Sequence, residues 1–496
     1  MNPSTASREL AVEVAVIGAG TAGLAAYRAA VSAGKRAVII EGGPYGTTCA
    51  RVGCMPSKLL IAAAEAAHAP ARWEAFGLKL DGRITIDGAA VMQRVKHERD
   101  RFVGFVLDGV NAIPEGDRIR GHARFVDDRT LEVGAGTRIT FGRAVIATGS
   151  SPSVPAFLRK LEERVVVNDD VFDWDDLPRS VAVIGPGVIG LEIGQALARL
   201  GVRTIVFGRM GHVGPFTDPQ VRAYAIRTFA REFTLESDAD LHGVERVAEG
   251  VRITYANGEG EPTSEVVDLV IAATGRMPNV RNLGLENTTL ELDVRGVPAF
   301  DRHTMQCGHH PIFIAGDASD DMPLLHEAAD EGRIAGHNAA KFPHVEPGLR
   351  RTPLAIVFSD PQLALAGARF ADLEPGTFVT GEVSFEDQGR SRVMLRNVGL
   401  LHVYADLMSG RLLGAEMIGP DAEHIAHLLA WVIQQRLTLT QTLEMPFYHP
   451  VVEEGLRTAL RDAQHKFLDA ERQRAMMEKK EAELECATES VNGALA

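Results

Sequence analysis

Cysteine is scarce in this sequence, with four residues among 496, which argues against a disulfide-stapled secreted protein. No uncharged apolar run reaches the roughly 18 residues that a membrane-spanning helix needs. The first ten residues, MNPSTASREL, lack the apolar segment of a secretory signal, and Glu9 is atypical of a transit peptide. We therefore expect a protein of the reducing cytoplasm that has no membrane partner.

Positive charge is also in short supply. The chain has 52 Lys and Arg against 66 Asp and Glu, a formal net charge of -14. Nucleic acids and acidic membranes repel such a surface, and no local Lys/Arg cluster reverses it, so we expect no nucleic acid partner. The length predicts three or four domains.

A repeat organises the first half of the chain. VAVIGAGTAGLAAYRAAVSAGKRAVIIEG at 14–42 aligns residue for residue with VAVIGPGVIGLEIGQALARLGVRTIVFGR at 181–209. Each copy reads as a strand, a GxGxxG turn, a helix and a second strand, which is the start of a dinucleotide-binding unit. The glycines permit close backbone approach, and the helix N-terminus presents free N–H groups to a diphosphate. The aligned glycines are Gly18, Gly20 and Gly23 in the first copy and Gly185, Gly187 and Gly190 in the second.

The two copies differ where their second strands end. The first has Glu41, an acid that suits the adenosine ribose of FAD. The second has Gly208 followed by Arg209, so it lacks the acid that favours NAD and gains a cation. Arg209 either meets the 2′-phosphate of NADPH or faces solvent. The choice between NAD and NADP stays open at this point.

Two of the four cysteines, Cys49 and Cys54, lie five positions apart in TTCARVGCMPSK. An ideal helix rises about 7.5 Å over five residues, whereas bridged cysteines need Cα atoms within roughly 7 Å. A bridge here requires a distorted helical turn, which suggests redox chemistry.

Cys307 lies near three histidines but has no second cysteine, so we expect no metal site.

Three further phrases mark strand ends and a change of pattern. AVIATGSSP at 144–152 and VIAATGRMP at 270–278 resemble each other, and PIFIAGDAS places Asp317 at the end of a buried strand. Such an acid contacts a ligand in many α/β folds, the alternative being a simple cap of the next segment. FPHVEPGLRRTP reads as a linker, and the alternating strands after residue 352 indicate an α+β domain.

In this order, the motifs resemble the class I FAD-dependent pyridine nucleotide-disulfide oxidoreductases over about residues 12–465, and among them most of all the dihydrolipoamide dehydrogenases. PLLHEAADEG at 323–332 and Val188 in the second glycine turn carry the likeness to that subfamily. The chain departs from the usual pattern at Thr47, at Arg51 between the two cysteines, at Gly208 and at Val451.

The resemblance implies an α/β fold with two Rossmann-like dinucleotide-binding domains, for FAD and NAD(P), and a C-terminal α+β interface domain. We expect the first part of the FAD domain, with the redox disulfide, at 1–165 and the NAD(P) domain at 166–284. The central part of the FAD domain follows at 285–350, the dimerisation domain at 351–465, and a helical or disordered tail at 466–496. The family forms homodimers, so a second chain could supply part of the site.

The resemblance also implies residue roles. Cys49 is then the interchange sulfur, Cys54 the charge-transfer sulfur beside the flavin, His449 the base and Glu454 the carboxylate that orients it. Pro450 suits the first position of the following helix. Beyond the first glycine turn and Glu41, the FAD contacts implied are Lys58, Thr148, Gly149, Asp317, Leu324, Leu325 and His326. Beyond the second glycine turn, the NAD(P) contacts implied are Val188, Ile189, Glu192, Arg209 and Gly275, with Glu192 also the counter-ion of Lys58.

The expected activity is oxidation of a dihydrolipoamide-type dithiol, free or carried on a lipoyl protein, through Cys49 and Cys54 and FAD to NAD. One alternative is an NADPH-dependent reductase of another disulfide, glutathione-like or otherwise, or of a quinone. A remote alternative is a nucleotide-binding flavoprotein with idle cysteines. The tail, which contains Cys486, either docks a partner or forms a solvated helix.

Overall fold

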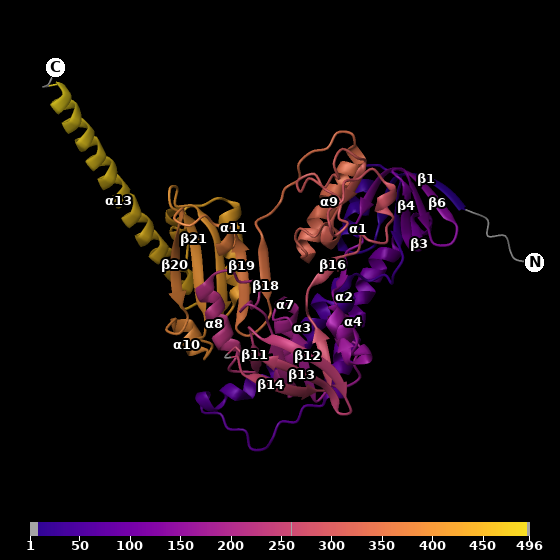
Figure 1. The fold of residues 1–496 in the computed structure, drawn as a ribbon, viewed down its shortest axis with the longest axis horizontal. Helices are drawn as coiled ribbons and strands as arrows, with labels where there is room; N and C mark the ends of the chain where they lie inside the picture. The colour runs from indigo at the N-terminus through magenta and orange to yellow at the C-terminus, as the bar shows by residue number, and fades with distance from the viewer. Residues whose placement is uncertain (1–7, 259, 494–496) are drawn as a thin grey trace, which may run out of the picture.

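The computed structural model describes residues 8–258 and 260–493, with side chains described as far as residue 485. Figure 1 shows the N-terminal sheet and the C-terminal sheet at opposite sides of the molecule, with the elements of the second repeat below and between them. Within these residues, no helix is long and apolar enough to cross a membrane.

The first repeat forms β1 (Arg8–Ile17), α1 (Thr21–Ser32) and β2 (Ala37–Glu41). Its sheet has the order β3-β2-β1-β6-β5-β4, with β17 beside β6, and β1 is parallel to β2 and β6. Both faces are covered, so Val14, Ala15 and Val16 are fully buried. The other strands are β3 (Arg118–Arg120), β4 (Ala123–Asp127), β5 (Thr130–Val133), β6 (Thr137–Ile146) and β17 (Ile312–Ile314).

Helix α9 (Leu325–Lys341) packs closely on α1. A Cβ on Gly332 would lie 2.2 Å from the Ala22 carbonyl oxygen, and one on Gly336 would lie 2.2 Å from that of Ala26. Glycine at both positions therefore lets the two helix backbones touch. This contact fixes the start of α9 beside the first glycine turn.

The second repeat forms β9 (Ser180–Ile184), α7 (Val188–Arg199) and β10 (Arg203–Phe207). Its parallel sheet has the order β11-β10-β9-β15-β8, and a separate antiparallel sheet is made of β12, β13 and β14. The bounds are β8 (Val165–Val166), β11 (Thr234–Glu236), β12 (Asp240–Val247), β13 (Gly250–Ala256), β14 (Pro262–Val267) and β15 (Leu269–Ala272). β8 thus straddles the boundary expected between residues 165 and 166.

The two repeats are joined where the similar segments 144–152 and 270–278 pair. β7 (Ser150–Pro152) pairs antiparallel with β16 (Arg276–Pro278). The cysteine segment lies beside this junction as α2 (Thr48–Val52) and α3 (Cys54–His68), and α3 packs on α4 (Gly88–Asn111) and α7.

The C-terminal domain is an antiparallel sheet in the order β18-β19-β22-β21-β20 with helices α11 and α13 against it. Its strands are β18 (Leu354–Val357), β19 (Gln362–Gly367), β20 (Phe378–Ser384), β21 (Leu400–Asp406) and β22 (Leu412–Gly419); its helices are α10 (Gly389–Val393), α11 (Ala422–Gln434), α12 (Leu439–Leu443) and α13 (Glu454–Gly493). The last part of α13 projects away from the body of the molecule (Figure 1). The α/β class with a C-terminal α+β domain is confirmed.

A buried polar cluster ties the second repeat to this domain. Asp218 precedes α8 (Pro219–Phe229), and its carboxylate lies 2.7 Å from His402 Nδ1 and accepts from Tyr404 Oη at 3.0 Å. Glu416 on β22 accepts from the Thr217 and Asp218 backbone N–H groups at 2.9 Å. Buried charges satisfied in this way position the second repeat against the C-terminal sheet.

Candidate active site

The two close cysteines lie on separate helices. α2 ends at Val52, and Gly53, with φ −131° and ψ −115°, interrupts the helix before α3 begins at Cys54. Both cysteines are free thiols, and a hydrogen bond joins their sulfurs. Gly53 thus supplies the distortion that a bridge between these positions requires.

Their surroundings make the two thiols unequal. The hydrogen bond with Cys49 lowers the pKa of Cys54 to about 7, burial opposes this, and the Lys58 ammonium reinforces it. The same hydrogen bond, together with burial, raises the pKa of Cys49. Cys54 is therefore the sulfur that carries negative charge near neutral pH.

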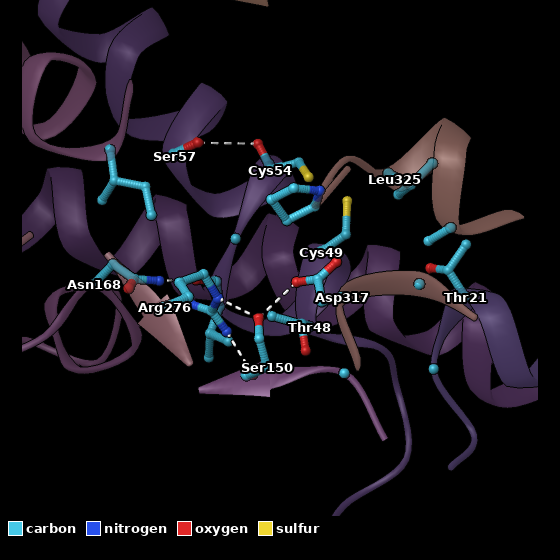
Figure 2. A pocket seen from close by; sticks show the side chains of 18 of the residues that line it. Thr21, Thr48, Cys49, Cys54, Ser57, Ser150, Asn168, Arg276, Asp317 and Leu325 are labelled. Carbon is cyan, nitrogen blue, oxygen red and sulfur yellow. Dashed lines mark hydrogen bonds between the residues drawn. The ribbon is translucent and has the colours of Figure 1, made fainter. Parts of the chain in front are cut away.

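Both sulfurs turn into a cavity of about 280 Å³, shown in Figure 2. Its wall includes Gly20 and Thr21 from the first glycine turn, and Val188 and Ile189 from the second. The turns of the two repeats therefore meet at the thiols. Groups held by the two turns could exchange electrons here with the cysteines.

Lys58 and Glu192 also line this cavity and form an ion pair. Lys58 Nζ donates to both carboxylate oxygens at 2.8 and 2.9 Å, and the Glu192 side chain is only 5% exposed. Glu192 also accepts from the backbone N–H of Phe358 at 3.0 Å. The lysine ammonium is thereby held at the cavity wall, close to Cys54.

A second cavity of about 860 Å³ adjoins the first and shares Gly20, Thr48 and Gly149 with it. A Cβ on Gly18 would lie 2.2 Å from the Ala147 carbonyl oxygen, whereas a Cβ on Gly20 would meet nothing within 4 Å. Gly18 thus serves the tight turn, while Gly20 leaves open space at the start of α1. These features fit the diphosphate of a dinucleotide.

The acid at the end of β2 lines the same cavity. Glu41 accepts from the backbone N–H of Ala19 at 2.8 Å and of Gly43 at 2.7 Å. Thr148 also lines this cavity and donates from its hydroxyl to the Asn279 carbonyl at 2.8 Å. The cavity therefore has the fixed acid and the open turn that FAD needs.

Asp317 belongs to a network that sequence reasoning missed. Ser150 Oγ donates to Asp317 at 2.6 Å, and Arg276 donates to the Ser150 hydroxyl and carbonyl at 2.8 Å, as the dashed lines in Figure 2 mark. Ser150 lies in the segment 144–152 and Arg276 in the segment 270–278, and the sequence analysis identified both segments. Their pairing as β7 and β16 is the tertiary fact that brings them to Asp317.

The start of α9 contributes one of its three predicted contacts to the cavity wall. Leu325 lines the 280 Å³ cavity, and Leu324 caps the helix. His326 is exposed and does not line either cavity described above, and burial lowers the pKa of its imidazole. The structure therefore places His326 beside the cofactor region rather than in its wall.

The second glycine turn opens on a third cavity, of about 710 Å³, near Gly185, Gly208 and Arg209. Gly185 and Gly190 repeat the close packing of the first turn, a Cβ on Gly187 would meet nothing within 4 Å, and Gly275 has φ +97°. Sequence reasoning missed Lys160 and His242, which line this cavity beside Arg209 and belong to no motif. Three basic side chains thus line the same cavity as Gly208, where the ribose acid is absent.

Gly208 is tightly enclosed. A Cβ there would lie 2.7 Å from the Ser237 carbonyl oxygen and 2.7 Å from Pro186 Cγ. An acid therefore cannot be introduced at position 208 without moving the backbone. The local packing, and not only the choice of residue, therefore keeps an acid out of this position.

His449 and Glu454 lie together, with His449 Nδ1 3.1 Å from both carboxylate oxygens. The hydrogen bond lowers the pKa of Glu454. The helix begins at Glu454, so the prediction that Pro450 occupies its first position was wrong. A turn closed by the hydrogen bond from the Glu454 backbone N–H to the Val451 carbonyl separates Pro450 from the helix. The His449 side chain is 81% exposed and does not line the cavity at the thiols.

Cys49 has access to a further, larger cavity of about 1410 Å³ on the other side of α2. This cavity, which sequence reasoning missed, is lined by α1, α4 and α9 and by the chain after residue 346, with Arg28, Phe105 and Arg351 in its wall. Cys54 lines the 280 Å³ cavity but not this one, although it is the more exposed thiol. Of the two thiols, Cys49 is thus the one that faces both spaces.

Paired thiols between two dinucleotide turns define a flavin- and pyridine-nucleotide-dependent disulfide oxidoreductase. Residues 12–332 match the family described as pyridine nucleotide-disulphide oxidoreductase, and residues 354–460 match its dimerisation domain. The chain belongs to this family, which uses FAD and NAD(P). The dimerisation domain supports a homodimer.

Relatives carry more than one activity in their names. The chain is 30% identical over 470 residues to dihydrolipoyl dehydrogenase of Haloferax volcanii, covering 91% of this chain and 96% of the relative. It is 32% identical over 473 residues to mercuric reductase of Shigella flexneri, covering 90% and 80%. The crystal structure of LpdA from Mycobacterium tuberculosis has the same fold, with a TM-score of 0.78 at 24% identity, covering 91% and 99%.

Proposed function

We propose that this chain forms a homodimeric dihydrolipoamide dehydrogenase-type enzyme, which oxidises a dithiol and reduces NAD reversibly. The observation that carries the proposal is the position of Cys49, which faces the flavin-side cavity and also the 1410 Å³ cavity. A dithiol entering the larger space reaches one sulfur of the pair. Cys54 remains on the side where the two glycine turns meet.

In the forward reaction, a substrate thiolate attacks Cys49 of the oxidised pair, and the Cys49–Cys54 bond breaks to release the Cys54 thiolate. The second substrate thiol then attacks the mixed disulfide, which closes the substrate disulfide and releases Cys49 as a thiol. The substrate loses two electrons and the cysteine pair gains them. FAD, when bound, supplies the route by which this electron pair passes as hydride to the nicotinamide.

A base must take the proton of the attacking thiol, because a free thiol is mostly protonated at pH 7. We assign this role to His449 from a second copy of the chain. Two features support the assignment: its imidazole is exposed, and its Nδ1 is held by Glu454, which leaves Nε2 free to accept a proton. Lys58, paired with Glu192, stabilises the Cys54 thiolate.

A second candidate is an NADPH-dependent reductase of an anionic disulfide such as a glutathione-like peptide. Arg209, Lys160 and His242 support it in the nucleotide cavity, because they suit a 2′-phosphate. Arg28 supports it in the 1410 Å³ cavity, because a cation there suits a substrate carboxylate. A quinone reductase and a catalytically idle flavoprotein are more distant alternatives. The scarcity of cysteine supports a reducing cytoplasm as the location of the enzyme.

Steady-state rates with four electron donors or acceptors test the proposal. Dihydrolipoamide with NAD should be turned over, and lipoamide should be reduced by NADH, each faster than glutathione disulfide or a quinone. A rate confined to glutathione disulfide with NADPH would favour the second candidate. Turnover of the quinone but of no disulfide would favour the quinone reductase, and turnover of neither would leave only the idle flavoprotein.

A further inference from the structure

Arg51 stands between the two redox cysteines, on the short helix α2. Its aliphatic stem lies against Gly46: a Cβ on that glycine would be 2.9 Å from Arg51 Cδ. Gly46 has φ +122°, a conformation that other residues rarely adopt. The local chain therefore leaves room for the arginine stem.

The direction of Arg51 separates it from the thiols. It lines the 860 Å³ cavity, but neither the 280 Å³ cavity nor the 1410 Å³ cavity, which are the two that Cys49 faces. Lys58 is the cation whose charge lowers the pKa of Cys54. Arg51 thus points its charge into the space that fits a dinucleotide.

Within the described residues, the Arg51 guanidinium has no ion pair within 4.0 Å and no side-chain hydrogen bond, although the residue is only partly exposed. The other charged groups of this wall are differently placed. Glu41 is occupied by two backbone N–H groups, Arg276 donates to Ser150, and Arg281 is exposed.

Asp169 lines the same cavity, and the charge of Arg51 acts on its pKa. Burial raises the pKa of Asp169, and the charges of Arg276 and then Arg51 act against that rise. The two side chains do not form an ion pair, and Asp169 accepts instead from Asn168 Nδ2 at 2.9 Å. A ligand that fills this cavity displaces water from the Arg51 guanidinium, and an anionic group on the ligand would offset the cost of that desolvation.

We propose that Arg51 binds the diphosphate of FAD, which is the anionic part of the cofactor that this family uses. A guanidinium presents paired N–H groups that match phosphate oxygens, and it adds a charged side-chain anchor to the backbone N–H groups of the glycine turn. This role rests on the cofactor of the family and not on the identity of the disulfide substrate. The segment that carries the two redox cysteines is thereby attached to the cofactor through Arg51, a residue between them.

The test is the rate at which the holoenzyme releases FAD, followed by the recovery of flavin fluorescence after dilution at several salt concentrations. Arg51→Gln keeps the stem against Gly46 and removes the charge. We expect it to release FAD at least ~10-fold faster, because the charged contact to the diphosphate is lost. A tenfold change corresponds to about 1.4 kcal/mol. We also expect its release rate to depend less on salt than that of the wild type, because a screened charge contact has been lost.

Matched variants separate this role from simple damage. Arg101→Gln removes an exposed arginine from α4, outside the cavity, and should behave as wild type. Arg51→Lys should retain the salt dependence, because it retains the charge. Arg51→Met provides a second uncharged variant should Arg51→Gln fail to fold. Unchanged release from the uncharged variants, or faster release with the wild-type salt dependence, would overturn the proposal.

Discussion

Lys58 Nζ and Glu192 Oε2 lie 2.8 Å apart and join the helix of the redox cysteines to the helix that follows the second glycine turn. The pair connects the two halves of the proposed reaction path. Lys58 lowers the pKa of Cys54 and Glu192 raises it, after the larger influences of Cys49 and burial. The two charges of the ion pair therefore act in opposite directions on the pKa of Cys54 and adjust how much thiolate is present at neutral pH.

The first prediction concerns this balance. In the two-electron-reduced holoenzyme, the long-wavelength charge-transfer absorbance of a thiolate beside the flavin should appear as pH rises through the pKa of Cys54, about 7. Lys58→Met should move the midpoint to higher pH because the cation that lowers the pKa is gone. Glu192→Gln should move it to lower pH. A spectrophotometric titration measures all three midpoints.

Cys54→Ser is the control for the assignment of the sulfurs. It should keep FAD and show no such absorbance at any pH, whereas Cys49→Ser should still show it. The opposite pattern would mean that the roles of the two cysteines are reversed.

The second prediction concerns the base. His449→Ala should lower dihydrolipoamide turnover by at least ~100-fold, a usual contribution of a positioned base. Reduction of a quinone by NADH needs no thiol proton transfer and should persist. Glu454→Gln should lower turnover less, because it weakens the contact that orients the imidazole and leaves the base in place. Near-normal dihydrolipoamide turnover in His449→Ala would assign the base to another residue.

The third prediction tests whether one site uses two chains. His449 is exposed and lines no cavity at Cys49 in its own chain. Cys49→Ser and His449→Ala homodimers should each be nearly inactive. A differently tagged heterodimer of the two variants contains one complete site if the residues come from different chains, and it should recover about half of the wild-type rate. A site built within one chain would give an inactive heterodimer.

The fourth prediction concerns the nucleotide. Arg209→Ala should raise the Michaelis constant for NADPH and leave that for NADH unchanged, because only the former has a 2′-phosphate. Lys160→Ala, at the same cavity, should act in the same direction. Gly208→Glu is a poor test, since its Cβ would collide with the Ser237 carbonyl. Equal effects of Arg209→Ala on both nucleotides would mean that the arginine does not read the phosphate.

The sequence predicted best those features that depend on neighbouring residues. The glycine turns, the strand–helix–strand pattern of each repeat and the helix interruption between Cys49 and Cys54 follow from local spacing. The ion pair of Lys58 and Glu192 was expected only through a family resemblance. Their contact depends on α3 packing against α7, which spacing does not reveal.

Other features depended on tertiary structure that no local pattern encodes. Ser150 and Arg276 meet because β7 and β16 pair across 126 residues. Lys160, His242 and Arg28 line their cavities without belonging to a motif. Pro450 was misplaced because proline also occurs in the segment before a helix, and here the helix begins only at Glu454.

The most direct test of the central claim is the rate of NADH formation from dihydrolipoamide and NAD by the FAD-loaded dimer, compared between wild type and Cys49→Ser. The account predicts turnover of wild type that Cys49→Ser abolishes, while the variant still reduces a quinone with NADH. Equal dihydrolipoamide turnover by both proteins would show that the cysteine pair does not carry the electrons, and would contradict the account.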